Sequence, residues 1–274
     1  MTDQNTEDRL SVVTQELGHM SGLSEWVTWF GVLSIASALL IVPVVAGPLL
    51  GGFPLETAFY GLIGLVALVT ILRSYTDASF LQRETRLAAE QVQDLIERDD
   101  ISGFLAGSGD SQFRTHIEAL YTIFQQDSEI AQDNLIEVMQ ERLLARNRLS
   151  ELFASILITL GLIGTIAGLI VMVSELRISM QDFDPDGGGN VIKELMRDGG
   201  ALSGLDTAFY TTLMGAVLGG VMLRVLTNVV ASNITRYTAF IAELSEVYVL
   251  PSLRNTAREL ERAGYYQGQG DDHG

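Results

Sequence analysis

Two threonines lie inside the most apolar parts of the second half of the chain, and their hydroxyls are the groups there that could do chemistry. Thr165 belongs to the stretch LGLIGTIAGLIVMV and Thr212 to the stretch TAFYTTLMGAVLGG. A threonine hydroxyl donates one hydrogen bond and accepts others, so it can contact water, a cation or a carboxyl group. The chain shows no nucleophile–base set around them. These hydroxyls are therefore candidates for hydrogen bonding, and we expect no catalytic residues.

The composition argues against several other functions. The chain has no cysteine, and its three histidines, His19, His116 and His273, are too far apart in sequence to suggest a metal pair. It contains no P-loop, no GxGxxG and no HExxH. Its net charge of -17 argues against a nucleic-acid partner, because phosphate neutralisation dominates such binding. We expect no metal, no bound cofactor and no nucleic acid.

One acidic stretch, DFDPDGGGN, resembles the opening of a calcium loop. Asp182, Asp184, Asp186 and Gly187 have the EF-hand spacing, but Lys193 occupies the position that needs a bidentate glutamate. Asp-Pro-Asp-Gly is also an ordinary turn sequence, which is the interpretation that we favour.

Long uncharged stretches indicate an integral membrane protein. A helix needs about 20 apolar residues to cross the hydrocarbon core. A charge at its centre costs about 3 kcal/mol. No Asp, Glu, Lys or Arg occurs in any of four ranges, residues 26–55, 57–72, 152–174 and 207–223. The predicted fold is an all-α integral membrane protein with four transmembrane helices and long cytoplasmic helical extensions.

The arginines assign the loops to the two sides of the membrane. They are concentrated between the second and third spans and after the fourth, whereas the loop AGPLLGGFPLE has none. The positive-inside rule then places both termini and the middle segment in the cytoplasm. The apolar spacing of Phe113, Ile117, Leu120 and Phe124 predicts a helix there, and the absence of Gly and Pro predicts that it runs on into the third span.

These assignments divide the chain into five segments. They are an N-terminal amphipathic segment over residues 1–25, a first transmembrane hairpin over 26–73, a cytoplasmic helical segment over 74–150, a second transmembrane hairpin over 151–230 with its outer loop at 175–206, and a cytoplasmic helical tail over 231–274.

Small residues form a stripe on each of the last two spans. Helices in lipid associate through close packing and interhelical hydrogen bonds, which small residues permit. The stripes predict a contact between the two helices, for which ordinary packing is the favoured explanation and a functional role the alternative. The residues expected in this contact are Gly161, Gly164, Gly168, Ala208, Gly215 and Gly219.

The two stretches that hold the threonines resemble a known family. LGLIGTIAGL resembles the LGxxGTVxG signature of the MotA/TolQ/ExbB proton channel family, and GLDTAFYTTLMGAVLGG resembles the signature of its last span. The resemblance covers about residues 110–250. It implies a homopentamer in the inner membrane that surrounds a dimer of single-span subunits similar to MotB, TolR or ExbD. In that arrangement the hairpin 151–230 forms the channel, and Thr165 and Thr212 line the pore with Thr211 beside them. Tyr210 is either a further pore residue or a packing residue, and spacing does not decide between the two.

The composition of the apolar spans is consistent with a channel whose ion-carrying carboxylate comes from another chain. They contain no Asp, Glu, Lys, Arg or His at mid-depth, so a carboxylate that carries H⁺ or Na⁺ has to come from a partner chain. Glu175 and Asp206 are expected at the outer mouth, where they attract cations or merely cap helix ends. The four spans resemble MotA, but the prolines of its last two spans are absent, which leaves the driven machine open. The alternative function is a non-conducting oligomeric scaffold that recruits proteins through its cytoplasmic helices.

Overall fold

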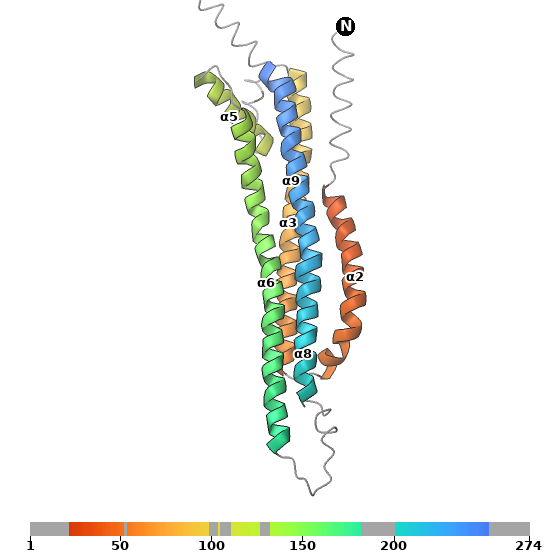
Figure 1. Ribbon diagram of the computed structural model, residues 1–274. Helices are drawn as coiled ribbons and strands as arrows, with labels where there is room; N and C mark the ends of the chain where they lie inside the picture. Colours follow the sequence, from red (N-terminus) through yellow and green to blue (C-terminus); the bar gives the residue numbers. More distant parts are fainter. Residues whose placement is uncertain are drawn as a thin grey trace, which may run out of the picture. The chain divides into compact units, whose positions relative to one another are not determined.

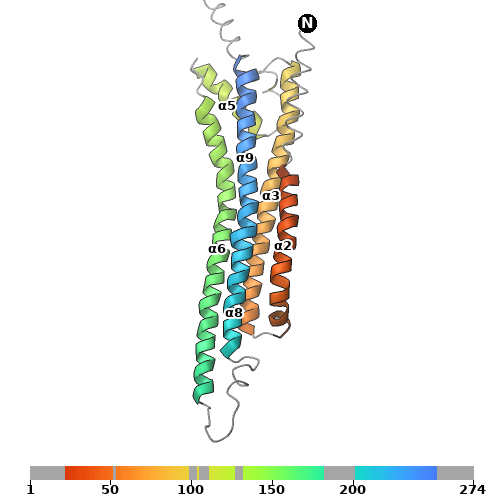
Figure 2. The same cartoon turned by 45° about the vertical axis from the view of Figure 1, so that its right-hand side comes forward.

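The computed structural model describes residues 22–51, 54–98, 104, 111–126, 132–181 and 201–251, and within them all regular structure is helical. Figures 1 and 2 show the helices from two directions. In chain order they are α2 (Gly22–Gly51), α3 (Pro54–Arg98), α5 (Gln112–Gln126), α6 (Gln132–Gln181), α8 (Ala201–Met214) and α9 (Arg224–Leu244), with the π-helical segments η1 (Gly215–Leu223) before α9 and η2 (Ser245–Val249) after it.

The prediction of an all-helical protein with four membrane-spanning helices is confirmed at the level of length and composition. The helices that are long and apolar enough to cross a membrane lie within Gly22–Val42, Thr57–Leu95, Gln132–Ile178 and Leu202–Val249. The chain is thus a multi-pass membrane protein.

The chain divides into two compact units. The span unit comprises residues 24–77 and 147–230, and the polar unit comprises the described residues of 1–23, 78–146 and 231–274.

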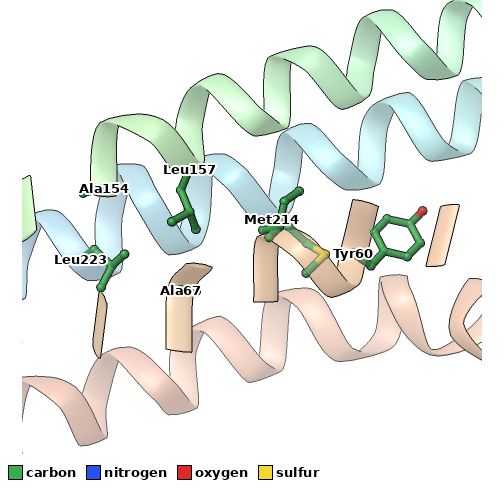
Figure 3. Packing of buried hydrophobic residues seen from close by; sticks show 7 residues of the cluster. Tyr60, Ala67, Ala154, Leu157, Met214 and Leu223 are labelled. Atoms are coloured by element: carbon green, nitrogen blue, oxygen red, sulfur yellow. The ribbon is translucent and has the colours of Figure 1, made fainter. Parts of the chain in front are cut away.

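An apolar cluster built from three helical segments forms the core of the span unit. Figure 3 shows its side chains meeting from α3, α6 and the fourth span. The members are Tyr60, Ile63, Ala67, Ala154, Leu157, Met214 and Leu223. Helix α2 packs on this unit through Ile41, which lies against the apolar cluster, and through two polar contacts. Trp26 Nε1 donates to Ser74 Oγ at 2.9 Å, and Ser37 Oγ lies 3.9 Å from Met222 Sδ.

The outward faces of the span unit are strongly apolar. Leu39 of α2 is 73% exposed and Ile170 of α6 is 64% exposed. Exposed apolar surface on this scale is typical of contact with lipid or with another subunit.

Helix α5 buries its apolar face within the polar unit. Phe113, Ile117 and Leu120, part of the predicted apolar stripe, are fully buried. Ser111 caps the helix, since Arg114 N donates to its Oγ at 3.1 Å. Glu84 of α3 accepts from Gln112 N at 2.8 Å, which satisfies a free donor at the helix start and places negative charge at the positive end of the dipole.

The predicted single helix from Phe113 into the third span is wrong. Helix α5 ends at Gln126 and α6 begins at Gln132. Asp133 lies in the first turn of α6, where the helix dipole favours an acidic side chain, so the sequence has a helix start signal although it has no Gly or Pro there. The predicted amphipathic helix before residue 22, the loop with Asp182, Asp184 and Asp186, and the tail after residue 251 lie outside the described residues.

Candidate pore site

The third and fourth spans touch through their backbones. A Cβ added at Gly161 would lie 2.9 Å from Thr211 O, one at Gly215 would lie 2.8 Å from Leu157 O, and one at Gly219 would lie 2.7 Å from Ala154 O. Backbone atoms cannot rotate away as a side chain can, so this approach requires glycine. Figures 1 and 2 both show α6 and α8 side by side.

All six residues that the sequence places in this contact lie in it. Besides the three glycines above, a Cβ at Gly164 would lie 2.6 Å from Thr211 Oγ1, and one at Gly168 would lie 2.6 Å from Ala208 N.

Gly204 is a contact residue that the sequence argument missed. A Cβ on Gly204 would collide with Met172 N and Gly168 O, so α8 approaches α6 as closely at Gly204 as it does at Gly161. Its signal was present in the sequence, because Gly204 precedes Ala208 by four residues and extends the stripe by one turn.

The contact brings the two predicted pore threonines together. The hydroxyls of Thr165 and Thr212 are hydrogen-bonded to each other. Thr165 Oγ1 lies 3.0 Å from Gly161 O and 3.3 Å from Ala208 O. Thr212 Oγ1 lies 3.0 Å from Ala208 O and 3.5 Å from Gly161 O. Each hydroxyl therefore lies within reach of a carbonyl oxygen of its own helix and one of the neighbouring helix.

Counting protons shows what this cluster offers to a ligand. The two hydroxyls have one proton each, and carbonyl oxygens only accept. One proton lies between Thr165 and Thr212, and the other is donated to Gly161 O or Ala208 O. Both protons are thus used within the cluster, so the pair presents lone pairs to its surroundings. Thr212 is exposed and Thr165 half-buried, so these lone pairs are accessible.

Thr211 and Tyr210, the other two predicted pore residues, have different surroundings. Thr211 is 0% exposed, donates to Thr207 O at 2.8 Å and packs on Gly164. Tyr210 is half-buried and packs against the apolar cluster of the span unit. The structure therefore groups Thr165 with Thr212 and places these two neighbours in helix packing.

The predicted outer-mouth carboxylates lie along the same two helices. Glu175 is ten residues after Thr165 and Asp206 is six residues before Thr212. At about 1.5 Å per residue, both are displaced from the threonine pair in the same direction, by about 15 Å and 9 Å. Glu175 is half-buried and Asp206 exposed. Among the residues that the structure describes, no group of His, Cys, Asp or Glu is suited to hold a metal.

Four apolar spans and a polar hydroxyl pair at a glycine contact define a helical multi-pass membrane protein with a candidate ion path. Residues 109–243, just under half of the chain, match the MotA/TolQ/ExbB proton channel family. The resemblance inferred from the two threonine-bearing stretches is therefore confirmed. The family consists of channels and not of enzymes. Comparison with curated proteins and with solved structures found no match.

Proposed function

We propose that this chain is the ion-conducting subunit of a motor in the inner or plasma membrane, with both termini in the cytoplasm. Five copies surround a dimer of a single-span subunit similar to MotB, TolR or ExbD. That subunit supplies the carboxylate, and flow of H⁺ or Na⁺ drives mechanical work or energised transport across the envelope. The family match and the exposed pair Thr165–Thr212 support the proposal.

The accessible lone pairs of the threonine pair carry the argument. They can accept a hydrogen bond from a protonated carboxylic acid or contribute oxygens to a cation. A carboxylate needs a donor, which the pair supplies only by giving up one of its own hydrogen bonds, at a net cost of about 1 kcal/mol. The pair thus prefers the partner's carboxyl group while it holds its proton or cation. Loss of the ion weakens the contact, which couples ion release to movement of the partner.

The surface around the pair fits a neighbour inside the membrane. Leu162 and Ile166 flank Thr165 on α6, and Phe209 precedes Thr212 by almost one turn; all three are more than half exposed. A polar pair framed by exposed apolar side chains suits contact with another helix, because water alone would not require the apolar frame.

The test is ion flux through proteoliposomes that contain the complex with its single-span partner. Thr212→Val keeps the shape of the side chain and removes the hydroxyl, and we expect flux to fall at least tenfold while the native mass stays unchanged. Thr159→Val is the matched control, since Thr159 is an exposed hydroxyl of the same apolar part of α6 that donates to Ser155 O at 3.0 Å.

Normal flux in the Thr212 variant would contradict the proposal. If both Thr165→Val and Thr212→Val changed only stability, the chain would instead act as the non-conducting scaffold. A native mass of one or two copies without a partner would exclude the pentameric arrangement.

A further inference from the structure

A layer of small polar side chains continues the apolar cluster of the span unit. At one end of that cluster, each of the three helical segments contributes one residue, namely Ala67, Ala154 and Leu223 (Figure 3). Ser74 follows Ala67 by seven residues, Ser150 precedes Ala154 by four, and Thr227 follows Leu223 by four. Side chains four or seven residues apart lie on one helix face. The three polar residues therefore form the next layer of the same contact.

Asn147, three residues before Ser150 on α6, joins this polar layer, and all four side chains are fully enclosed. Ser74 and Ser150 are 0% exposed, and Asn147 and Thr227 are 1% exposed. Asn147 Nδ2 donates to Thr227 O at 3.0 Å, which ties α6 to α9. Ser74 Oγ accepts from Trp26 at 2.9 Å, which ties α2 to α3.

Two atoms of the layer have no hydrogen-bond partner in the described part of the chain. They are Ser150 Oγ and Asn147 Oδ1. The two residues are three apart on α6, so they are neighbours on the helix surface, with about 5–6 Å between their Cβ atoms. One atom is a hydroxyl that can donate and the other an amide oxygen that accepts. A water molecule satisfies both, and buried waters occupy such polar sites between packed elements.

We propose that Asn147 and Ser150 hold one ordered water molecule between α3, α6 and α9. The water accepts from Ser150 Oγ and donates to Asn147 Oδ1. Because this fixes the amide of Asn147, it also fixes the bond from Nδ2 to Thr227 O. The water therefore helps to set the position of the fourth helix against the third, just beyond η1. The inference does not depend on ion conduction.

The sign of a stability change tests the proposal. In the purified full chain, Ser150→Ala removes one of the two anchors of the water, so we expect the apparent melting temperature to fall by about 2 to 4 °C. A dry layer gives the opposite sign, because the substitution then removes a buried hydroxyl without a partner. Ser155→Ala is the matched control on α6, since Ser155 is exposed and bonds only to Glu151 O within the described chain; we expect no shift.

A double-mutant cycle gives a second, independent readout. Ser150→Ala combined with Asn147→Leu should cost less than the sum of the single losses, because either substitution alone already releases the shared water. Additive losses, or a higher melting temperature of Ser150→Ala, would overturn the proposal. If Asn147→Leu fails to fold, Asn147→Asp replaces it in the cycle, since it keeps the acceptor for the water and puts a carboxyl oxygen in place of the amide donor to Thr227 O. Additivity with Ser150→Ala is then the expected result, and strong coupling would overturn the proposal.

Discussion

Replacing Gly161 by alanine tests the close contact between the third and fourth spans and its link to the hydroxyl pair. The new Cβ would lie 2.9 Å from Thr211 O, 3.2 Å from Gly215 Cα and 3.4 Å from Thr212 Cα. Ordinary contact begins at about 3.4 Å, so the two backbones must separate by several tenths of an ångström. Overpacking of this kind costs about 1 to 3 kcal/mol. Alanine recovers up to about 1 kcal/mol through its helix propensity.

The net expectation is a loss of about 1 to 2 kcal/mol, or about 2 to 8 °C in the apparent melting temperature. Separation also weakens the interhelical half of the threonine cluster, because Thr212 Oγ1 is already 3.5 Å from Gly161 O. Ion flux should therefore fall together with stability. The control is Gly64→Ala in α3, where the added Cβ meets nothing within 4 Å and should leave stability unchanged or slightly higher. A Gly161→Ala protein with the stability and the flux of the parent would refute the argument.

Further predictions concern stability alone. Burial lowers the pKa of His116 from 6.5 to about 4, so below pH 6.5 the unfolded chain takes up the proton first. Stability should fall between pH 6.5 and pH 4 by up to about 3 kcal/mol, and His116→Gln should flatten that part of the pH profile of melting. Glu84→Ala leaves Gln112 N without its acceptor and should cost about 1 kcal/mol, seen as faster proteolysis near α5; Glu90→Ala, at an exposed site on the same helix, is the control. Trp26→Phe removes the bond to Ser74 Oγ and should lower the melting temperature, whereas Trp29→Phe on the exposed face of α2 should not.

The sequence was sufficient to predict the four spans. It also predicted which face of the third and of the fourth span carries small residues. Charge-free length indicates a membrane helix because the cost of a buried charge is large and local. The glycine stripes indicate a close approach because almost nothing else allows backbones to meet. Gly204 shows the limit of that argument: its stripe was visible, but spacing alone does not say how far along the helices a contact extends. The break between α5 and α6 was missed because it depends on a helix start signal, Asp133, and not on a helix breaker.

The hydrogen bonds of the site could not be predicted from the sequence either, because residue spacing does not say which partner a hydroxyl bonds. The family resemblance placed Thr165 and Thr212 at the pore, with Thr211 beside them. Only the structure shows that the Thr211 hydroxyl donates to Thr207 O of its own helix, whereas the Thr212 hydroxyl is bonded to Thr165 of the opposite helix. Side chains of adjacent helix residues point about 100° apart. A difference of one residue therefore determines whether a threonine lies inside the helix contact or on the surface that would line a pore.

The π-helix η1 explains how the fourth span keeps small and buried residues against α6 over so long a contact. Gly215, Gly219, Leu223 and Thr227 follow one another at intervals of four residues. Gly215 and Gly219 meet the backbone of α6, Leu223 shares a cluster with Ala154, and Thr227 O accepts from Asn147. In an α-helix of 3.6 residues per turn, each interval of four overshoots by about 40°, so three intervals would drift by about 120° and leave the contact. A π-helix bonds residues five apart and turns less per residue, so it cancels most of this drift. The wider helical turn thus lets the hydroxyl pair at Thr212 and the Asn147 contact at Thr227 face the same neighbour.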